Sequence, residues 1–402
     1  MSENNVEKQY VIYDANFRLE KNGTLNGKQP ETGEAVEAAI KAQKESFCRN
    51  FFEQNSFKHI VVLSGAGTSM GDVDLVKEGK DRKGLWTACE DTIKDICEII
   101  KEKSSSCKAA IGDNDIEGFL SYVERYASVV VGGPDEERLK GLIGNLKTAI
   151  RENCLLNFKE KKEPHLGFLR KLIARKANLP RVEVFTTNYD TLFEQAAKSA
   201  NIVVIDGFSF SMPREFAGRN FDLDIVNRAR SRIKGEENFI PNVIHLFKLH
   251  GSVDWVMDEK RNVVVQRDPE DNDNALMVYP SADKYAASYD QPYFEMMSRF
   301  QTAVRRDELL LIVVGFGFRD KHINNVVVEA AKQNPSCHLL IVDYSGKNNP
   351  ISLRDYEEIF NGLGSNISIF NGTFGEFVEC MPLNGAYKFD MNGEAAEAGN
   401  VR

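Results

Sequence analysis

Short apolar runs rich in Val, Ile and Leu recur along the chain, and their length predicts buried strands. The runs cover residues 60–63, 182–185, 203–205, 243–247, 309–314, 339–342 and 367–370. Helical spacing of apolar residues lies between several of them, over residues 191–200, 324–333 and 353–360. This alternation of strand and helix favours a mostly parallel sheet with crossover helices. The sequence therefore predicts an α/β chain with a doubly wound, Rossmann-like fold.

A different pattern fills residues 85–164, where apolar residues recur at intervals of three and four and β-branched runs nearly vanish. Such spacing is typical of amphipathic helices. We therefore expect a helical subdomain that is inserted into a discontinuous sheet domain of residues 34–84 and 165–382. One of its helical faces is traced by Leu139, Leu142, Ile143, Leu146, Ile150 and Cys154.

The remaining segments carry weaker signals. Residues 1–33 combine a short extended piece at 10–13 with Asn-Gly turn signals, which favours an N-terminal arm. Residues 383–402 are rich in Gly, Ala and Glu, and this composition predicts a disordered tail. Residues 262–267 and 275–279 flank an acidic stretch, and we expect them to pair as a hairpin.

Four of the predicted strands stop at short strings that contain Gly, Asn, Asp or His. In a parallel sheet these strand ends share one edge, where open α/β sheets hold their ligands. The pattern therefore predicts a binding site for a phosphorylated molecule, built from four loops. The strings are Gly65-Ala66-Gly67-Thr68-Ser69, Thr187-Asn188-Tyr189-Asp190, Leu249-His250-Gly251-Ser252 and Gly315-Phe316-Gly317-Phe318.

Glycines after a strand allow backbone amides to approach a pyrophosphate, because a glycine has no Cβ atom. Gly65-Ala66-Gly67 fits this use, but a tight turn from strand to helix would use the same residues. The string also lacks the third glycine of the usual dinucleotide fingerprint and the lysine of a P-loop. By itself this string favours phosphate binding without deciding it.

Two other strings carry polar side chains that are suited to chemistry. His250 follows an apolar strand and enters a loop with small neighbours, where an imidazole could take a proton from a hydroxyl or a water. Asn188 and Asp190 stand just before a predicted helix. Asp190 could simply cap that helix, whereas a cap alone does not require Asn188 as well.

Composition narrows the range of functions. The 402 residues carry a formal net charge of −9, which gives no general attraction to nucleic acid or anionic membranes. No apolar stretch is long enough to cross a bilayer and the first residues do not resemble a secretory signal, so we expect a cytoplasmic protein. The seven cysteines are scattered and include no Cys-x-x-Cys pair, which argues against disulfides and a zinc site.

The first three strings, in this order, resemble the motifs of the sirtuin family of NAD-consuming enzymes. The resemblance implies that residues 65–69 bind the NAD phosphates. It also implies that Asn188 and Asp190, beside Thr187, hold the ribose that carries the nicotinamide, and that His250 is the catalytic base.

Two further positions extend the resemblance over residues 60–343. Gly315-Phe316-Gly317 is similar to a later glycine-containing loop that touches NAD, and Asp343 stands where an acidic or amide residue often meets the adenosine ribose. Sirtuin deacylases also carry an Asp-Phe-Arg segment after the first string and two zinc-binding Cys-x-x-Cys pairs. Residues 70–74 and 253–255 depart from these features, so the comparison argues against deacylation and against zinc.

With these departures, the chain is similar to the sirtuin-like effectors of bacterial antiphage systems, which hydrolyse NAD. The loop from Gly315 to Ile323 resembles theirs. A chain that is little more than one such domain resembles the partner of HerA-type hexameric ATPases. The resemblance therefore implies an antiphage NAD hydrolase that assembles with such an ATPase and with further copies of itself. It would reach nucleic acid only through that complex.

The expected reaction is hydrolysis of the bond between nicotinamide and ribose. Asn188 would orient the ribose and the attacking water, and His250 would accept a proton. Asp190 would hold Asn188 or stabilise positive charge on the sugar. Three alternatives stay open: a zinc-free NAD-dependent deacylase, a subunit that binds NAD or ADP-ribose without turnover, and a nuclease that acts with an ATPase.

Overall fold

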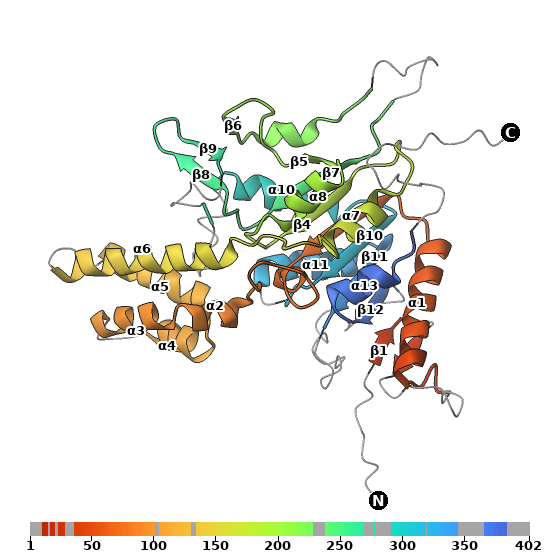
Figure 1. The fold of residues 1–402 in the computed structure, drawn as a ribbon, viewed down its shortest axis with the longest axis horizontal. Coiled ribbons are helices and arrows are strands. Elements are labelled where there is room, and N and C mark those ends of the chain that lie inside the picture. Colours follow the sequence, from red (N-terminus) through yellow and green to blue (C-terminus); the bar gives the residue numbers. More distant parts are fainter. Residues whose placement is uncertain are drawn as a thin grey trace, which may run out of the picture.

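The computed structural model describes residues 10–14, 17–20, 23–28, 36–100, 104–129, 134–227, 238–268, 276–277, 291–318, 320–344 and 366–383. These residues form one large sheet with helices on both faces, and a group of helices that extends to one side (Figure 1). The predicted helix at 353–360 lies outside the described residues, and so does the predicted tail beyond Leu383.

Nine strands of the described residues form the main sheet. In spatial order they are β2 (Arg18–Glu20), β1 (Tyr10–Tyr13), β12 (Ile367–Asn371), β11 (Cys337–Asp343), β10 (Leu309–Val314), β3 (His59–Ser64), β4 (Val182–Thr186), β7 (Val243–Lys248) and β5 (Val203–Ile205). The seven strands from β12 to β5 are parallel. The predicted fold class, a doubly wound α/β chain with a mostly parallel sheet, is confirmed.

Residues of the predicted N-terminal arm extend this sheet at one edge. β1 pairs antiparallel with β12, with Ile12 opposite Phe370, and β2 pairs antiparallel with β1. Ile12 and Leu19 are fully buried. The described part of this segment therefore belongs to the sheet and its core.

The strand order reverses direction between β3 and β10. From β3 the chain moves outward on one side through β4 to β5 and β7, and then returns to place β10 on the other side of β3. From there it continues outward to β11 and β12. The loops that follow β3 and β10 therefore flank the topological switch point, which is where open α/β sheets hold ligands.

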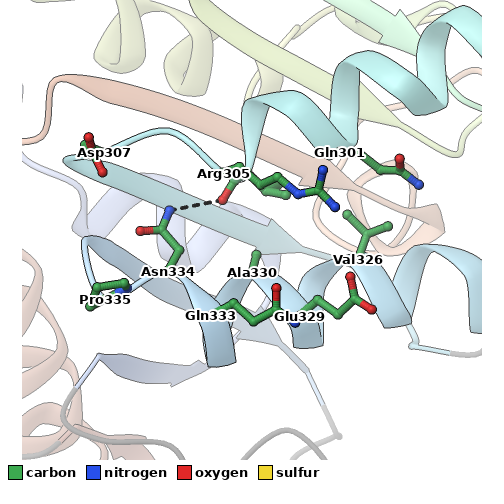
Figure 2. A pocket seen from close by; sticks show the side chains of 10 residues that line it. Gln301, Arg305, Asp307, Val326, Glu329, Ala330, Gln333, Asn334 and Pro335 are labelled. Atoms are coloured by element: carbon green, nitrogen blue, oxygen red, sulfur yellow. Dashed lines mark hydrogen bonds between the residues drawn. The ribbon is translucent and has the colours of Figure 1, made fainter.

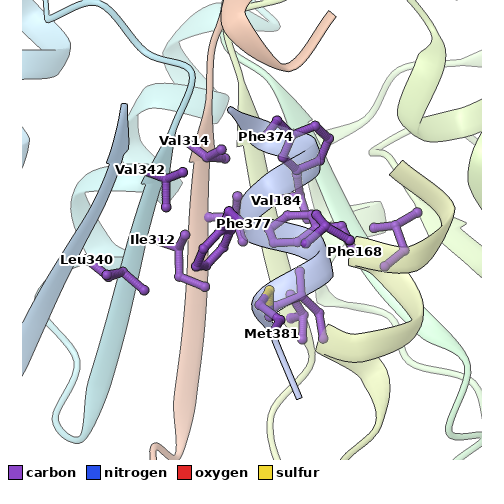
Figure 3. Packing of buried hydrophobic residues seen from close by; sticks show 14 of the residues in the cluster. Phe168, Val184, Ile312, Val314, Leu340, Val342, Phe374, Phe377 and Met381 are labelled. Carbon is purple, nitrogen blue, oxygen red and sulfur yellow. The ribbon is translucent and has the colours of Figure 1, made fainter. Parts of the chain in front are cut away.

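Side chains alternate between the two faces of the sheet, as the pleat of a strand requires. Leu310 and Ile312 face the cluster under α1 (Val36–Gln54), α7 (His165–Ile173), α8 (Leu192–Ser199) and α13 (Phe374–Cys380). Leu311 and Val313 face α10 (Tyr293–Ala303) and α11 (Lys321–Gln333). Figure 3 shows α13 lying across the strands with Phe377 beside Ile312. Burial on both faces explains why these strands read as continuous apolar runs.

The helices of the region predicted to be inserted have a core of their own. They are α2 (Arg82–Ala88), α3 (Glu90–Ile99), α4 (Ser105–Gly112), α5 (Ile116–Val129) and α6 (Pro134–Cys154). Their buried side chains form a third cluster, which Tyr189 and Val253 join from the loops after β4 and β7. The helical group therefore packs against the loops at the carboxyl edge of the sheet. The predicted domain boundaries stay predictions.

The expected hairpin has a different partner strand. β9 (Val263–Gln266) pairs antiparallel with β8 (Trp255–Asp258) on one side and with β6 (Arg214–Glu215) on the other, so both of its edges are taken. A four-residue turn joins β8 to β9, with Asn262 at φ 50°, and so short a connection favours pairing of the two strands that it joins. Leu276 instead donates its amide to Trp255 O, at 2.7 Å. The hairpin prediction was therefore wrong in its second strand.

Within the described segments, no helix is both long enough and apolar enough to cross a lipid bilayer.

Candidate functional site at the carboxyl edge

Two glycine strings meet backbone to backbone at the switch point. The amide of Gly67 donates to Gly315 O at 2.9 Å, and the amide of Gly65 donates to Val314 O at 3.1 Å. A Cβ atom built on Gly65 would lie 2.7 Å from Gly315 O. Gly315 has a φ of +60°, and a Cβ there would lie 2.6 Å from the backbone N of Thr68. These glycines are required because the two loops touch.

This close approach changes the predicted role of the first string. The amides of Gly65, Gly67 and Thr68 donate to carbonyls of the protein, the last of them to Gly65 O at 3.0 Å. These three amides are therefore not the groups that would hold a pyrophosphate. In contrast, a Cβ on Gly317 would meet nothing within 4 Å, so that the backbone there has open space beside it. Phe316, which stands between Gly315 and Gly317, is buried.

Asn188 lies in a buried network that joins the loop after β4 to the short helix η1 (Ala66–Ser69). Its Nδ2 donates to Thr68 Oγ1 at 3.1 Å and to Ser69 Oγ at 3.0 Å. Thr68 Oγ1 in turn lies 3.0 Å from Ser64 Oγ, at the end of β3. The side chain of Asn188 is therefore fixed by hydroxyl groups, and its amide cannot flip without losing both bonds.

Asp190 uses one oxygen in this network and the other at a helix end. Oδ2 accepts a hydrogen bond from Ser69 Oγ at 2.7 Å. Oδ1 accepts from the amide of Leu192, the first residue of α8, at 3.1 Å. The N-cap of α8 is Thr191, so Asp190 is not the cap itself; it binds the first amide of the helix and also holds Ser69 against Asn188. The neighbouring Thr187 anchors the same loop, because its amide donates to Ser64 O at 3.0 Å.

A buried lysine holds the loop that follows β4. Lys248, at the end of β7, is 2% exposed; its Nζ donates to the carbonyls of Tyr189 and Asp190 and lies 3.2 Å from Glu194 Oε1. Burial raises the pKa of Glu194 to about 7, although the Lys248 ammonium acts in the opposite direction. Sequence reasoning missed both residues. The signal available in the sequence was a lysine at the end of a mostly apolar strand.

His250 stands one residue beyond Leu249, in the loop after β7. Its Nε2 lies 3.1 Å from Asp320 Oδ2, and the two side chains are only 13% and 10% exposed. Its ring centroid is 6.4 Å from that of Tyr189, which places it beside the loop that carries Asn188. Gly251, with φ +85°, lets the chain turn away directly after the histidine. Sequence position thus puts His250 at the same edge as Asn188.

Asp320, which faces the imidazole of His250, was not singled out from the sequence. Its other oxygen, Oδ1, accepts from the amides of His322 and Ile323 at 3.1 and 3.4 Å, which makes Asp320 the N-cap of α11. One oxygen therefore fixes the carboxylate to the helix while the other faces the imidazole. The available signal was an aspartate immediately before a helical pattern.

Asp343 lies at the same edge of the sheet, two strands from β3. It ends β11, and its Oδ1 accepts from the amide of Tyr344 at 2.9 Å. β10 separates it from β3 in the strand order.

Of the residues predicted for the site, the structure joins Thr68, Ser69, Asn188 and Asp190 by hydrogen bonds. Among the residues that it describes, no group of three or more His, Cys, Asp or Glu is placed to hold a metal ion.

A cavity of about 260 Å³ lies at the opposite edge of the sheet (Figure 2). Arg305 and Asp307 precede β10, and Asn334 precedes β11, so these residues mark the amino ends of the strands. Asn334 Nδ2 donates to Val304 O at 3.2 Å and to Arg306 O at 2.8 Å. Asn334, the most buried polar side chain of this cavity, therefore links the loop before β11 to the loop before β10.

Comparison with known families supports a sirtuin-like relationship. The model of the SIR2-like domain family matches residues 182–360, from β4 to beyond β11. The match includes Asn188, His250 and Asp320, whereas the Gly65–Ser69 string precedes it. SIR2-like domains bind NAD and are NAD-dependent enzymes, so the match is consistent with an NAD-related activity. No curated protein matches the chain.

Proposed function

We propose that this chain is an NAD glycohydrolase, which uses water to cleave NAD into nicotinamide and ADP-ribose. The proposal rests on two fixed groups that lie at the same edge of the sheet, within the residues that the SIR2-like family matches. These groups are the Asn188 amide, held by two hydroxyls, and the His250 imidazole, held by Asp320. Hydroxyls, an amide and an imidazole at a switch point are chemically suited to a dinucleotide substrate.

Asn188 would orient the reacting groups. Because Nδ2 is engaged by Thr68 and Ser69, the amide keeps one orientation and offers Oδ1 as an acceptor for a water or a ribose hydroxyl. Ser69 also bonds to Asp190, so that the carboxylate acts on Asn188 through this serine. Asp190 is therefore a positioning residue in this scheme.

His250 would move the proton. In the tautomer in which Nε2 donates to Asp320, Nδ1 carries the lone pair that would accept a proton from the attacking water or a ribose hydroxyl. The Asp320 carboxylate then stabilises the positive charge that appears on the imidazole. NAD itself supplies the reactive bond between nicotinamide and ribose.

The absence of Cys-x-x-Cys pairs from the sequence favours water over an acylated protein as the second substrate. The proposal extends to a role as an antiphage effector that depletes NAD together with a HerA-type ATPase and further copies of the chain. This extension is supported by the resemblance of the loop from Gly315 to Ile323.

The test is product analysis with the full chain. The purified protein is incubated with NAD, alone and with a co-expressed HerA-type ATPase, and the products are separated by chromatography. We expect equal amounts of nicotinamide and ADP-ribose without any acylated peptide. Nicotinamide release only with acylated peptide would identify a deacylase, and NAD binding without products in either preparation would identify a binding subunit.

Three variants connect the activity to the site. Asn188→Ala and His250→Ala are each expected to lower turnover about 100-fold or more, because each removes a group that acts on the reacting atoms. His59→Gln is the matched control, since His59 begins β3 at the opposite edge of the sheet. Wild-type turnover in both alanine variants would refute the assignment.

A further inference from the structure

Helices α1 and α13 lie side by side on one face of the sheet (Figure 1). Lys44 Nζ on α1 and Glu376 Oε2 on α13 form an ion pair at 3.1 Å. Cys48 and Cys380 each stand four residues further along their own helix. Residues four apart share one face of a helix, and the side chains of Cys48 and Cys380 interact, so the two cysteines meet one turn beyond the ion pair.

The two cysteines differ in their surroundings. Cys48 is 1% exposed inside the core cluster, whereas Cys380 is partly exposed at the margin of the same cluster. The two side chains are hydrogen-bonding partners of each other. Solvent therefore reaches the side chain of Cys380 and not that of Cys48.

Cys48 and the cation of Lys44 favour a thiolate at Cys380. The hydrogen bond with Cys48 lowers the pKa of Cys380 and Lys44 acts in the same direction, while burial, Glu45 and Glu376 oppose them. Lys171 also reaches this place, since its Nζ donates to the carbonyl of Val378 in the last turn of α13. Thiolates next to cations and hydrogen-bond donors are the reactive form of cysteine.

We propose that Cys380 is a site of oxidation by hydroperoxides and that Cys48 is its resolving partner. The Cys380 sulfur attacks one peroxide oxygen; an S–O bond forms, the O–O bond breaks and the other oxygen leaves as water or an alcohol. The Cys48 sulfur then attacks the Cys380 sulfur, the S–O bond breaks and the oxygen leaves as water with the Cys48 proton. The two sulfurs lose two electrons, which the peroxide gains, and a disulfide joins α1 to α13.

The experiment follows the two sulfurs in the reduced full chain. Protein is exposed to equimolar hydrogen peroxide at neutral pH, blocked with N-ethylmaleimide, digested and analysed by mass spectrometry. We expect one cross-linked pair of peptides, which carry Cys48 and Cys380, lighter by two hydrogen atoms and separated again by dithiothreitol.

Single variants separate the two steps. In Cys48→Ser the Cys380 sulfenic acid accumulates and is trapped by dimedone, whereas Cys380→Ser gives neither the adduct nor the cross-link. Cys97→Ser is the matched control, because Cys97 is a partly exposed cysteine on α3; this variant is expected to form the cross-link as the wild type does. A cross-link between other cysteines, or no oxidation of Cys380, would overturn the proposal.

A second measurement needs no variant. In the wild type, Cys380 should react with iodoacetamide about tenfold faster than Cys97 at neutral pH, because it has more thiolate character. Equal rates at the two positions would contradict the proposal even if a serine variant did not fold.

Discussion

At the scale of single residues, His250 and Asp320 form the pair on which the proposed chemistry depends. Their atoms are 3.1 Å apart and largely shielded from water, so that the carboxylate acts strongly on the charge of the imidazole. The sequence located the histidine from its place after an apolar run. It did not reveal the aspartate as a partner, because 70 positions separate the two residues along the chain.

Asp320→Asn tests this pair. The amide should still cap α11 through its oxygen, but it no longer stabilises a protonated imidazole. We expect kcat for NAD to fall about 100-fold while KM changes little. Steady-state kinetics measure both quantities, and unchanged kcat would show that His250 does not need the carboxylate.

Gly315 and Gly317 provide a second test at this scale. Alanine at 315 would be strained at φ +60°, and its Cβ would clash with the backbone of Thr68. We expect the free energy of unfolding of Gly315→Ala to fall by about 2 kcal/mol. Alanine at 317 has open space, so Gly317→Ala should unfold at nearly the wild-type urea concentration. Equal urea midpoints for the two variants would contradict the packing described.

At the scale of elements, β7 and the start of α8 hold the loop that carries Asn188. The buried ammonium of Lys248 bonds to two carbonyls of that loop and pairs with Glu194 on α8. Loop and helix are thus anchored to the end of one strand. Buried ionic groups cost desolvation energy, and their partners offset that cost only while both are present.

Lys248→Met should leave the carbonyls of Tyr189 and Asp190 without their donor. We expect the free energy of unfolding to fall by about 3 kcal/mol, as for other broken buried pairs. Glu194→Gln in the same chain should recover part of the loss, because a neutral amide replaces the buried carboxyl group that has lost its cation. A double-mutant cycle from urea unfolding measures the coupling, and strictly additive effects would mean that the two side chains do not interact.

At the scale of the whole molecule, buried histidines connect folding to pH. His165 begins α7 fully buried, surrounded by the rings of Phe158, Phe193 and Phe374. Burial lowers its pKa to about 3. His245 on β7 is affected in the same way, with a pKa of about 4.

The sign of the resulting pH dependence follows from proton uptake. Below about pH 6.5 the unfolded chain protonates His165, whereas the folded chain does so only near pH 3. Stability therefore decreases as the pH falls through this window, by about 1.4 kcal/mol per pH unit for this group. His165→Phe should reduce the slope of stability against pH between 6 and 4, measured by urea unfolding. An unchanged slope would exclude His165 as a contributor.

The apolar runs and their polar ends determined much of this protein from the sequence alone. Continuous Val, Ile and Leu runs predicted buried parallel strands, because a strand that is covered on both faces needs no alternation. Parallel strands end at a common edge, so the strings at 65–69, 187–190, 249–252 and 315–318 were expected at that edge.

Tertiary structure alone decided which side chains meet. Ser69 bonds to Asp190 across 121 positions, Asp320 faces His250, and Cys48 meets Cys380. It also showed that three amides of the first glycine string are used within the protein and that β9 pairs with β8. The periodicity of apolar residues shows which face of an element is buried. It does not show which residue lies across a contact, because that depends on how distant elements pack in space.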